Sequence, residues 1–124
     1  MCVDSDARPP ISPQGRAATR SLVLEASDGT RFSAFEATAP EGPTPAAVIV
    51  LPDVRGLFPF YEDVAACLAE AGSDAIAIDY FGRTAGTEPR DPDFDFMEHV
   101  GLTHSGGINA DIAAAADHLR ARND

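Results

Sequence analysis

Two segments near the start of the chain alternate between apolar and polar residues, and a turn signal separates them. Residues 20–26 (RSLVLEA) and 31–37 (RFSAFEA) show the period of two that indicates a β-strand. Asp28 and Gly29 stand between them, and an Asp-Gly pair favours a tight hairpin turn. The pattern therefore predicts an antiparallel hairpin, followed by a proline-rich connector at residues 39–45.

The next part of the chain has the pattern of a strand, a helix and a second strand. Residues 46–51 (AAVIVL) are continuously apolar, which is typical of a strand in the middle of a sheet that is covered on both faces. Apolar residues recur at spacings of three and four in residues 60–71, so we expect a helix there. Residues 74–79 (DAIAID) then predict a short strand, parallel to the first through a right-handed crossover.

A long connection and a final helix complete the chain. Residues 80–104 contain glycines and prolines, and a connection of this length is usually functional or mobile. We expect a short helix within it, near residues 94–100. Residues 107–122 predict a further helix, whose apolar stripe consists of Ile108, Ile112, Ala115 and Leu119. Together these elements predict an α/β fold in three layers (αβα), with helices on both faces of one sheet.

The composition indicates a single domain with a strongly acidic surface. The chain has 124 residues and a formal net charge of -11. Such a surface repels phosphates, so we expect no nucleic acid and no membrane as partners, and no segment approaches the ~20 apolar residues that cross a bilayer. We expect residues 1–19, which are polar and contain three prolines, to form a disordered extension, and residues 20–124 to form the domain.

The rare residue types exclude several kinds of chemistry. All nine basic residues are arginine, so the chain has no lysine for a phosphate-binding P-loop or for Schiff-base catalysis. Cys2 and Cys67 lie in different settings and suggest no disulfide framework, which favours a cytoplasmic protein with reduced thiols. His99 and His104 match no metal-ligand spacing with the nearby aspartates. We therefore expect no metal site and no cofactor.

Charged residues follow both predicted parallel strands. Asp53 and Arg55 come after residues 46–51, and Asp79 and Arg83 lie at the end of residues 74–79 and just beyond. Ligands of open α/β sheets bind at the carboxyl ends of the parallel strands, which places these side chains at one edge of the sheet. An aspartate at a strand end also often caps the turn that follows it, and both interpretations remain open at this point.

Three stretches of the sequence carry a resemblance to a known family. They are AVIVLPDVRGL at residues 47–57, the helix that ends in LAEAG at residue 72, and AIAIDYFGR at residues 75–83. In this order, after a hairpin, they resemble the N-terminal portion of the dienelactone hydrolase family, a branch of the α/β-hydrolases. The resemblance implies the N-terminal part of an α/β-hydrolase sheet. It also implies a hydrolase that cleaves a small-molecule carboxylic ester or lactone through an acyl-enzyme.

The same resemblance implies a nucleophile outside this sequence. The cysteine nucleophile of the family lies in a G-x-C-x-G turn, like the G-x-S-x-G turn of serine members, one strand beyond the position of the last helix here. Cys67 lies in the middle of a predicted helix, and Ser105 lacks the first glycine of such a turn and a preceding strand. Neither is a credible substitute, so we expect the 124-residue chain to be inactive alone.

Three residues match functional positions of the family. The loop after AVIVL supplies a backbone N–H to the oxyanion hole, and the matching residue is Val54. Asp53 stands where dienelactone hydrolase has a glutamate that contacts the nucleophile, and its shorter side chain puts dienelactone itself in doubt as the substrate. Arg83 matches an arginine that binds the substrate carboxylate, a role that suits its planar fork, whereas a solvated loop arginine is the plainer alternative.

A different class of function and one structural consequence complete the sequence-based expectations. The alternative function is a small non-catalytic α/β domain of receiver or flavodoxin-like type, with Asp53 and Asp79 near a ligand. The absence of lysine and of a glycine-rich phosphate loop disfavours it.

In either case the apolar strands present an edge without a partner strand, so we expect possible self-association through that edge.

Overall fold

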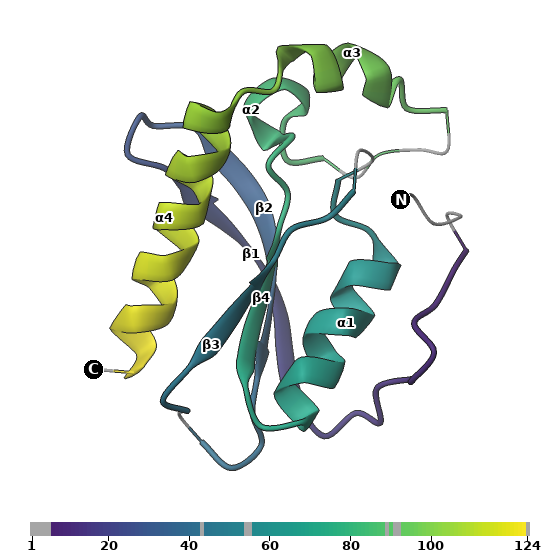
Figure 1. Ribbon diagram of the computed structural model, residues 1–124, viewed down its shortest axis with the longest axis vertical. Coiled ribbons are helices and arrows are strands. Elements are labelled where there is room, and N and C mark those ends of the chain that lie inside the picture. The colour runs from purple at the N-terminus through teal and green to yellow at the C-terminus, as the bar shows by residue number, and fades with distance from the viewer. Residues whose placement is uncertain (1–5, 43, 54–55, 89, 91–92, 124) are drawn as a thin grey trace.

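The computed structural model describes residues 6–42, 44–53, 56–88, 90 and 93–123, with only the backbone described for the last two. The strands are β1 (Ala18–Glu25), β2 (Arg31–Thr38), β3 (Ala47–Val50) and β4 (Asp74–Ile78). The helices are α1 (Pro59–Glu70), α2 (Gly82–Ala85), α3 (Phe96–Leu102) and α4 (Ser105–Asn123). Figure 1 shows α1 and α4 on opposite sides of the strands, with α2 and α3 gathered at one end.

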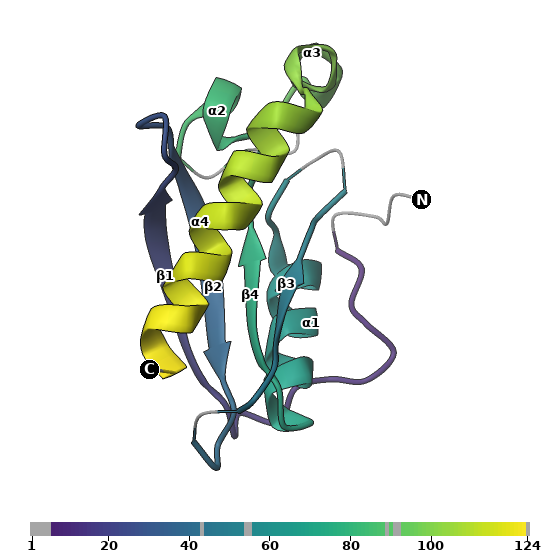
Figure 2. The same cartoon turned by 60° about the vertical axis from the view of Figure 1, so that its left-hand side comes forward.

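The four strands form one sheet in the order β1-β2-β4-β3 (Figure 2). β1 and β2 are antiparallel and in register from Ala18 opposite Thr38 to Glu25 opposite Arg31, which confirms the predicted hairpin. β3 and β4 are parallel, with α1 as their connection, which confirms the predicted βαβ unit. The hairpin joins this unit through an antiparallel pairing of β2 with β4.

The position of β3 in the sheet differs from the expectation. We expected the apolar residues 46–51 in the middle of the sheet, but within the described residues β3 is an edge strand, and Val48 is 36% exposed. The central position belongs instead to β4, in which every residue is buried. β4 lies between β2 and β3, so hydrogen bonds flank it on both sides, whereas β3 has a partner on one side only among the described residues. Self-association through the β3 edge stays a prediction.

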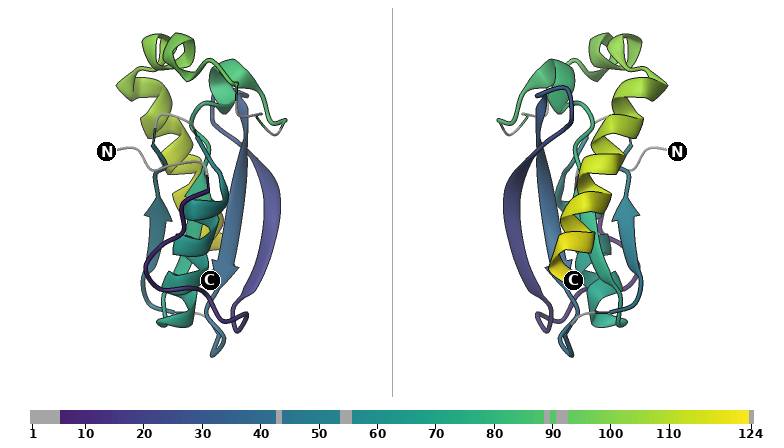
Figure 3. Two further views of the ribbon diagram at one scale, coloured as in Figure 1. Left: turned by 90° about the vertical axis from the view of Figure 1, so that its right-hand side faces the viewer. Right: turned by 90° about the vertical axis from the view of Figure 1, so that its left-hand side faces the viewer.

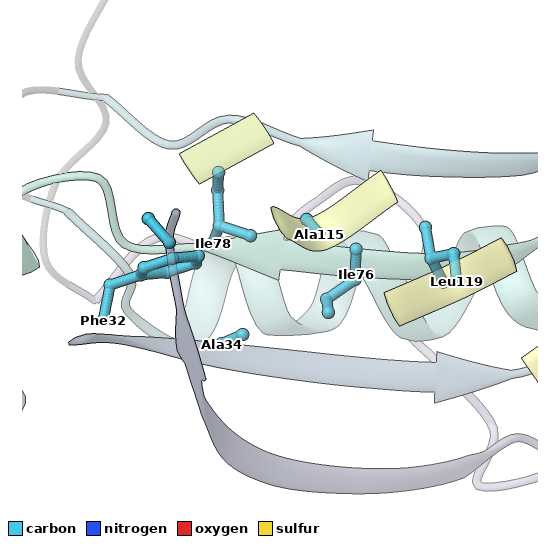
Figure 4. Close-up of a cluster of buried hydrophobic side chains, with 7 residues drawn as sticks. Phe32, Ala34, Ile76, Ile78, Ala115 and Leu119 are labelled. Atoms are coloured by element: carbon cyan, nitrogen blue, oxygen red, sulfur yellow. The ribbon is translucent and has the colours of Figure 1, made fainter. Parts of the chain in front are cut away.

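Alternation along the strands divides the core into two layers. Phe32 and Ala34 of β2 and Ile76 and Ile78 of β4 point toward α4, where Ala115 and Leu119 meet them (Figure 4). The opposite face packs against α1, and the buried residues of this layer are Ala37, Ala75 and Ala77 of the sheet with Ala65 and Ala69 of α1. Figure 3 shows the two helices on the two faces, so the predicted three-layer arrangement is confirmed. Small residues dominate the α1 side, which brings that helix close to the sheet.

The N-terminal segment runs along α1 before β1 begins (Figure 3). The backbone N–H groups of Gln14 and Arg16 donate to the Glu70 carboxylate at 2.9 Å. β1 begins at Ala18, two residues earlier than the predicted strand. The division into residues 1–19 and 20–124 stays a prediction, and residues 1–5 lie outside the described residues.

The helices after β4 also differ in their bounds from the sequence-based expectation. The long connection contains α2 as well as the short helix that we expected, which is α3 and begins two residues later than predicted. The final helix, α4, begins at Ser105 instead of Gly107. Across the described part of the chain, no helix combines the length and the apolarity that crossing a membrane requires.

Candidate active site

The loop that follows β3 lies against the residues that follow β4. The Tyr80 hydroxyl donates to the carbonyl oxygen of Pro52 at 3.1 Å and to that of Asp53 at 3.3 Å. The carboxylate of Asp79 accepts the backbone N–H groups of Leu57 and Phe81. The structure therefore brings the ends of the two parallel strands together, as their direction predicts. Val54, our candidate oxyanion-hole donor, lies outside the described residues, as does Arg55.

Asp79 forms a buried ion pair with Arg90, which sequence reasoning missed. The two side chains are 3% and 12% exposed. Arg90 also donates from Nη2 to the carbonyl oxygen of Gly86 at 3.1 Å, and its guanidinium lies 5.2 Å from the centre of the Phe94 ring. Burial raises the pKa of Asp79, and Arg90 partly offsets that effect. No sequence signal distinguishes Arg90, because it lies in the long connection with no motif around it.

Gly56 allows the loop to approach this ion pair closely. Its φ is +84°, a conformation that favours glycine, and its N–H donates to the Asp53 carbonyl at 3.0 Å. A Cβ atom at this position would lie 2.7 Å from Oδ1 of Asp79 and 2.8 Å from Nη1 of Arg90. Position 56 therefore requires glycine for both its backbone conformation and its packing.

A cavity of about 510 Å³ opens beside these groups, on the α1 face of the sheet. Its walls come from β1, β2, the start of α1 and the segment after α2. The residues of the wall that carry polar groups include Ser21, Ser33, Glu62, Asp79 and Arg90. Burial, with a smaller contribution from Asp63, raises the pKa of Glu62. The wall of the cavity combines apolar side chains with ionisable groups, a combination that is typical of sites for small molecules.

Arg83 lies away from this cavity and has several partners within the protein. Its Nη2 donates to the Asp111 carboxylate at 2.9 Å, its Nε donates to the Gly107 carbonyl at 3.1 Å, and its Nη1 pairs with Asp28. Asp111 is fully buried, whereas the side chain of Asp28 is 50% exposed. Arg83, through its hydrogen bond, holds the pKa of Asp28 far below its usual value. The guanidinium thus joins the hairpin turn, α2 and α4.

Arg83 also lines a second, smaller cavity, of about 220 Å³, with Tyr80 and His104. Sequence reasoning missed its two acidic partners, because Asp28 precedes it by 55 residues and Asp111 follows it by 28. The role of Arg83 in substrate binding stays a prediction.

The cysteine and the histidines of the described chain are engaged elsewhere. The Cys67 thiol donates to the carbonyl oxygen of Ile11 at 3.2 Å, and its pKa is raised, mainly by burial. His104 Nδ1 accepts the backbone N–H of Gly107 at 3.0 Å. His118 pairs with Glu36. None of these contacts, within the ranges that the structure describes, places a histidine against Cys67 or Ser105.

His99 makes a different contact, in which its Nδ1 lies 2.6 Å from Oγ1 of Thr84. Among the described residues, no three His, Cys, Asp or Glu side chains gather closely enough to hold a metal ion.

Comparison with known families and structures identifies the chain. The family described as "Dienelactone hydrolase family" matches residues 32–124. The chain belongs to the dienelactone hydrolase family. Membership in this hydrolase family argues against the alternative interpretation as a receiver or flavodoxin-like domain. No curated protein matches the chain.

Solved structures show the same fold for this member of the dienelactone hydrolase family. A Klebsiella pneumoniae protein described as "Putative Dienelactone Hydrolase" is 24% identical, with a TM-score of 0.65 over 86% of the chain. A hypothetical protein from Pseudomonas aeruginosa is 21% identical, with a TM-score of 0.56 over 96% of the chain. The α/β-hydrolase fold is therefore confirmed. The chain covers 45% and 35% of the lengths of these two proteins.

Proposed function

We propose that this chain forms part of a hydrolase that cleaves a carboxylic ester or lactone through an acyl-enzyme. The observation that carries the proposal is the loop after β3, whose described residues are fixed to the end of β4 beside a cavity. An acyl-transfer enzyme needs hydrogen-bond donors set in advance where negative charge develops on the acyl oxygen. The family resemblance assigns one such donor to this loop.

The proposed donor is the backbone N–H of Val54. Asp53, which precedes it, takes the position of the carboxylate that contacts the nucleophile. Both assignments come from the sequence match, and the fixed flanks of the loop support them, because a donor contributes most when it does not reorganise during the reaction.

Arg83 is the proposed ligand for a carboxylate of the substrate, at the smaller cavity that it lines with Tyr80. Its partner Asp28 is half-exposed, so a substrate carboxylate can take the place of Asp28, while Asp111 keeps its own contact with the guanidinium. An arginine fork binds two carboxylates in this way without losing its planar geometry.

We also propose that the 124-residue chain is inactive by itself and that the protein is cytoplasmic. The contacts of Cys67 and of the three histidines support inactivity, and the paucity of cysteines supports the location. The first test is the hydrolysis of a nitrophenyl ester by the isolated chain. We expect no turnover above that in buffer. Turnover that disappears when one residue of the chain is changed would contradict the proposed inactivity.

The second test joins the chain to part of a structural neighbour, which we expect to supply the nucleophile. Residues 1–123, which include all of α4, are joined to the C-terminal part of the Klebsiella pneumoniae protein, and nitrophenyl acetate hydrolysis is measured. Val54→Pro removes the backbone N–H, whereas the matched control Val54→Ala keeps it. We expect the proline variant to lose about 10²- to 10³-fold in kcat, as other enzymes do when one oxyanion-hole donor is removed. Equal rates for the two variants would refute the role of Val54.

A further inference from the structure

We infer that Asp79 and Tyr80, the two residues directly after β4, are positioning residues for the loop that follows β3. They fix that loop at two points, one before and one after residues 54–55. The inference rests on the proposed function, because it assigns these residues to the support of the oxyanion-hole loop. Neither residue needs to touch a substrate in this role.

Tyr80 holds the part of the loop that precedes Val54. Its hydroxyl lies 3.1 Å from the carbonyl oxygen of Pro52 and 3.3 Å from that of Asp53, so one donor spans two successive peptide groups. The Tyr80 ring packs edge-on against Phe81, with the ring centres 4.8 Å apart, and Phe81 is only 1% exposed. A buried neighbour thus sets the direction of the hydroxyl.

Asp79 holds the part of the loop that follows residue 55. Its carboxylate accepts the backbone N–H of Leu57, and Gly56 packs so closely against it that only a hydrogen atom fits between them. The carboxylate is itself fixed by the guanidinium of Arg90 and by the N–H of Phe81 at 3.2 Å. Asp79 is therefore a rigid acceptor at the end of a buried strand.

The two contacts have a common consequence for the described parts of the loop. Since Pro52 and Asp53 are held on one side and Gly56 and Leu57 on the other, the ends of the two-residue segment between them are fixed relative to β4. An oxyanion-hole donor must lie about 2.7–3.1 Å from the developing charge, and a displacement of about 1 Å can cost 10²-fold in rate. Asp79 and Tyr80 lie outside the loop and hold its described parts in place, which meets this need for a fixed position.

The contact with Asp79 is tested by NMR on the 124-residue chain labelled with ¹⁵N. An amide proton that donates to a carboxylate changes its chemical shift when the carboxylate ionises. We expect the Leu57 amide to show such a step with pH in the wild type and to show none in Asp79→Asn. A Leu57 resonance without a step in the wild type, or with the same step in Asp79→Asn, would overturn the inference for Asp79.

The contact with Tyr80 is tested by amide hydrogen exchange in the same chain. Tyr80→Phe removes only the hydroxyl. We expect amide exchange at Gly56 and Leu57 to accelerate about five- to tenfold, which corresponds to the loss of one hydrogen bond. The matched control is Thr44→Val, which removes a hydroxyl that donates to the Ala46 carbonyl at 2.6 Å, in the connector before β3 and away from the loop that follows it. Unchanged exchange in Tyr80→Phe, or equal acceleration in both variants, would overturn the inference for Tyr80.

A kinetic measurement separates positioning from general stability. In the chimaeric hydrolase described above, we expect Tyr80→Phe to lower kcat and leave KM unchanged, whereas Thr44→Val changes neither. A change in KM with kcat unchanged would contradict the positioning role of Tyr80. If Val54→Pro and Val54→Ala are equally active, the proposed oxyanion role fails, but the NMR and exchange results still decide whether Asp79 and Tyr80 hold the loop.

Discussion

The ion pair between Arg83 and Asp111 gives the sharpest prediction about stability. Asp111 is fully buried, and Arg83 contacts its two carboxylate oxygens at 2.9 and 3.3 Å. The variant Arg83→Met keeps most of the side-chain volume and removes the charge, which leaves a buried carboxylate without its cation. Breaking a buried pair in this way costs about 3–5 kcal/mol in the free energy of unfolding.

The assay is urea unfolding followed by far-UV circular dichroism, because the chain contains no tryptophan. With a slope of about 2 kcal/mol per M, the expected loss lowers the midpoint by about 1.5–2.5 M. The matched control is Arg120→Met, since Arg120 is 76% exposed and pairs with the equally exposed Asp117. That substitution is expected to change the stability by less than about 0.5 kcal/mol.

The pH dependence of the same variant has a definite sign. Burial raises the pKa of Asp111 and Arg83 lowers it, so removing Arg83 raises this pKa further. An acid whose pKa is higher in the folded state stabilises the fold below its unfolded pKa, and that contribution is lost as the pH rises through the folded pKa. The difference in stability between the wild type and Arg83→Met is therefore expected to shrink from pH 7 toward pH 4.

Two results would refute this reasoning. The first is a loss of less than about 1 kcal/mol at pH 7, which would mean that the buried carboxylate does not need its cation. The second is a difference between the variant and the wild type that grows as the pH falls. A double variant, Arg83→Met with Asp111→Leu, provides an internal check, because removing both charges should recover much of the lost stability.

Two further predictions concern the core and the cysteine. Phe32→Ala removes a fully buried ring and should lower the free energy of unfolding by about 3–5 kcal/mol in the same urea assay. Val23→Ala, at a site 43% exposed, should lower it far less. Equal losses in the two variants would contradict the described core. Burial, then Glu70 and Asp63, raise the pKa of Cys67, so iodoacetamide at pH 8 should alkylate it more slowly than a short cysteine peptide when Cys2 is replaced by serine. Alkylation at the rate of the peptide would show that the thiol is not protected.

Local patterns predicted most of the elements of this protein. The hairpin, the helix α1 and the strand β4 were each predicted within two residues of their ends, because periods of two and of three to four are set by side chains close together in the sequence. The meeting of Asp53 with the end of β4 also followed from the sequence, since two parallel strands joined by a helix end at the same edge.

The order of the strands was not predictable in this way. β3 is as apolar as β4, yet β3 lies at the edge and β4 in the centre, because β2 pairs with β4. That pairing joins residues about 40 positions apart, and no local pattern specifies which apolar strand a hairpin will join.

The sequence by itself determined the elements, the family resemblance and the strand-end residues, because each depends on neighbouring positions in the chain. Only the tertiary structure decided how the charges are paired. Arg90 lies against Asp79, and Arg83 lies against Asp111 as well as the half-exposed Asp28. The folded chain buries Asp79 and Asp111, and a nearby cation offsets the cost of removing these two carboxylates from water. The same packing attaches the loop after β3 to Tyr80 and Asp79, a contact between residues more than 20 positions apart.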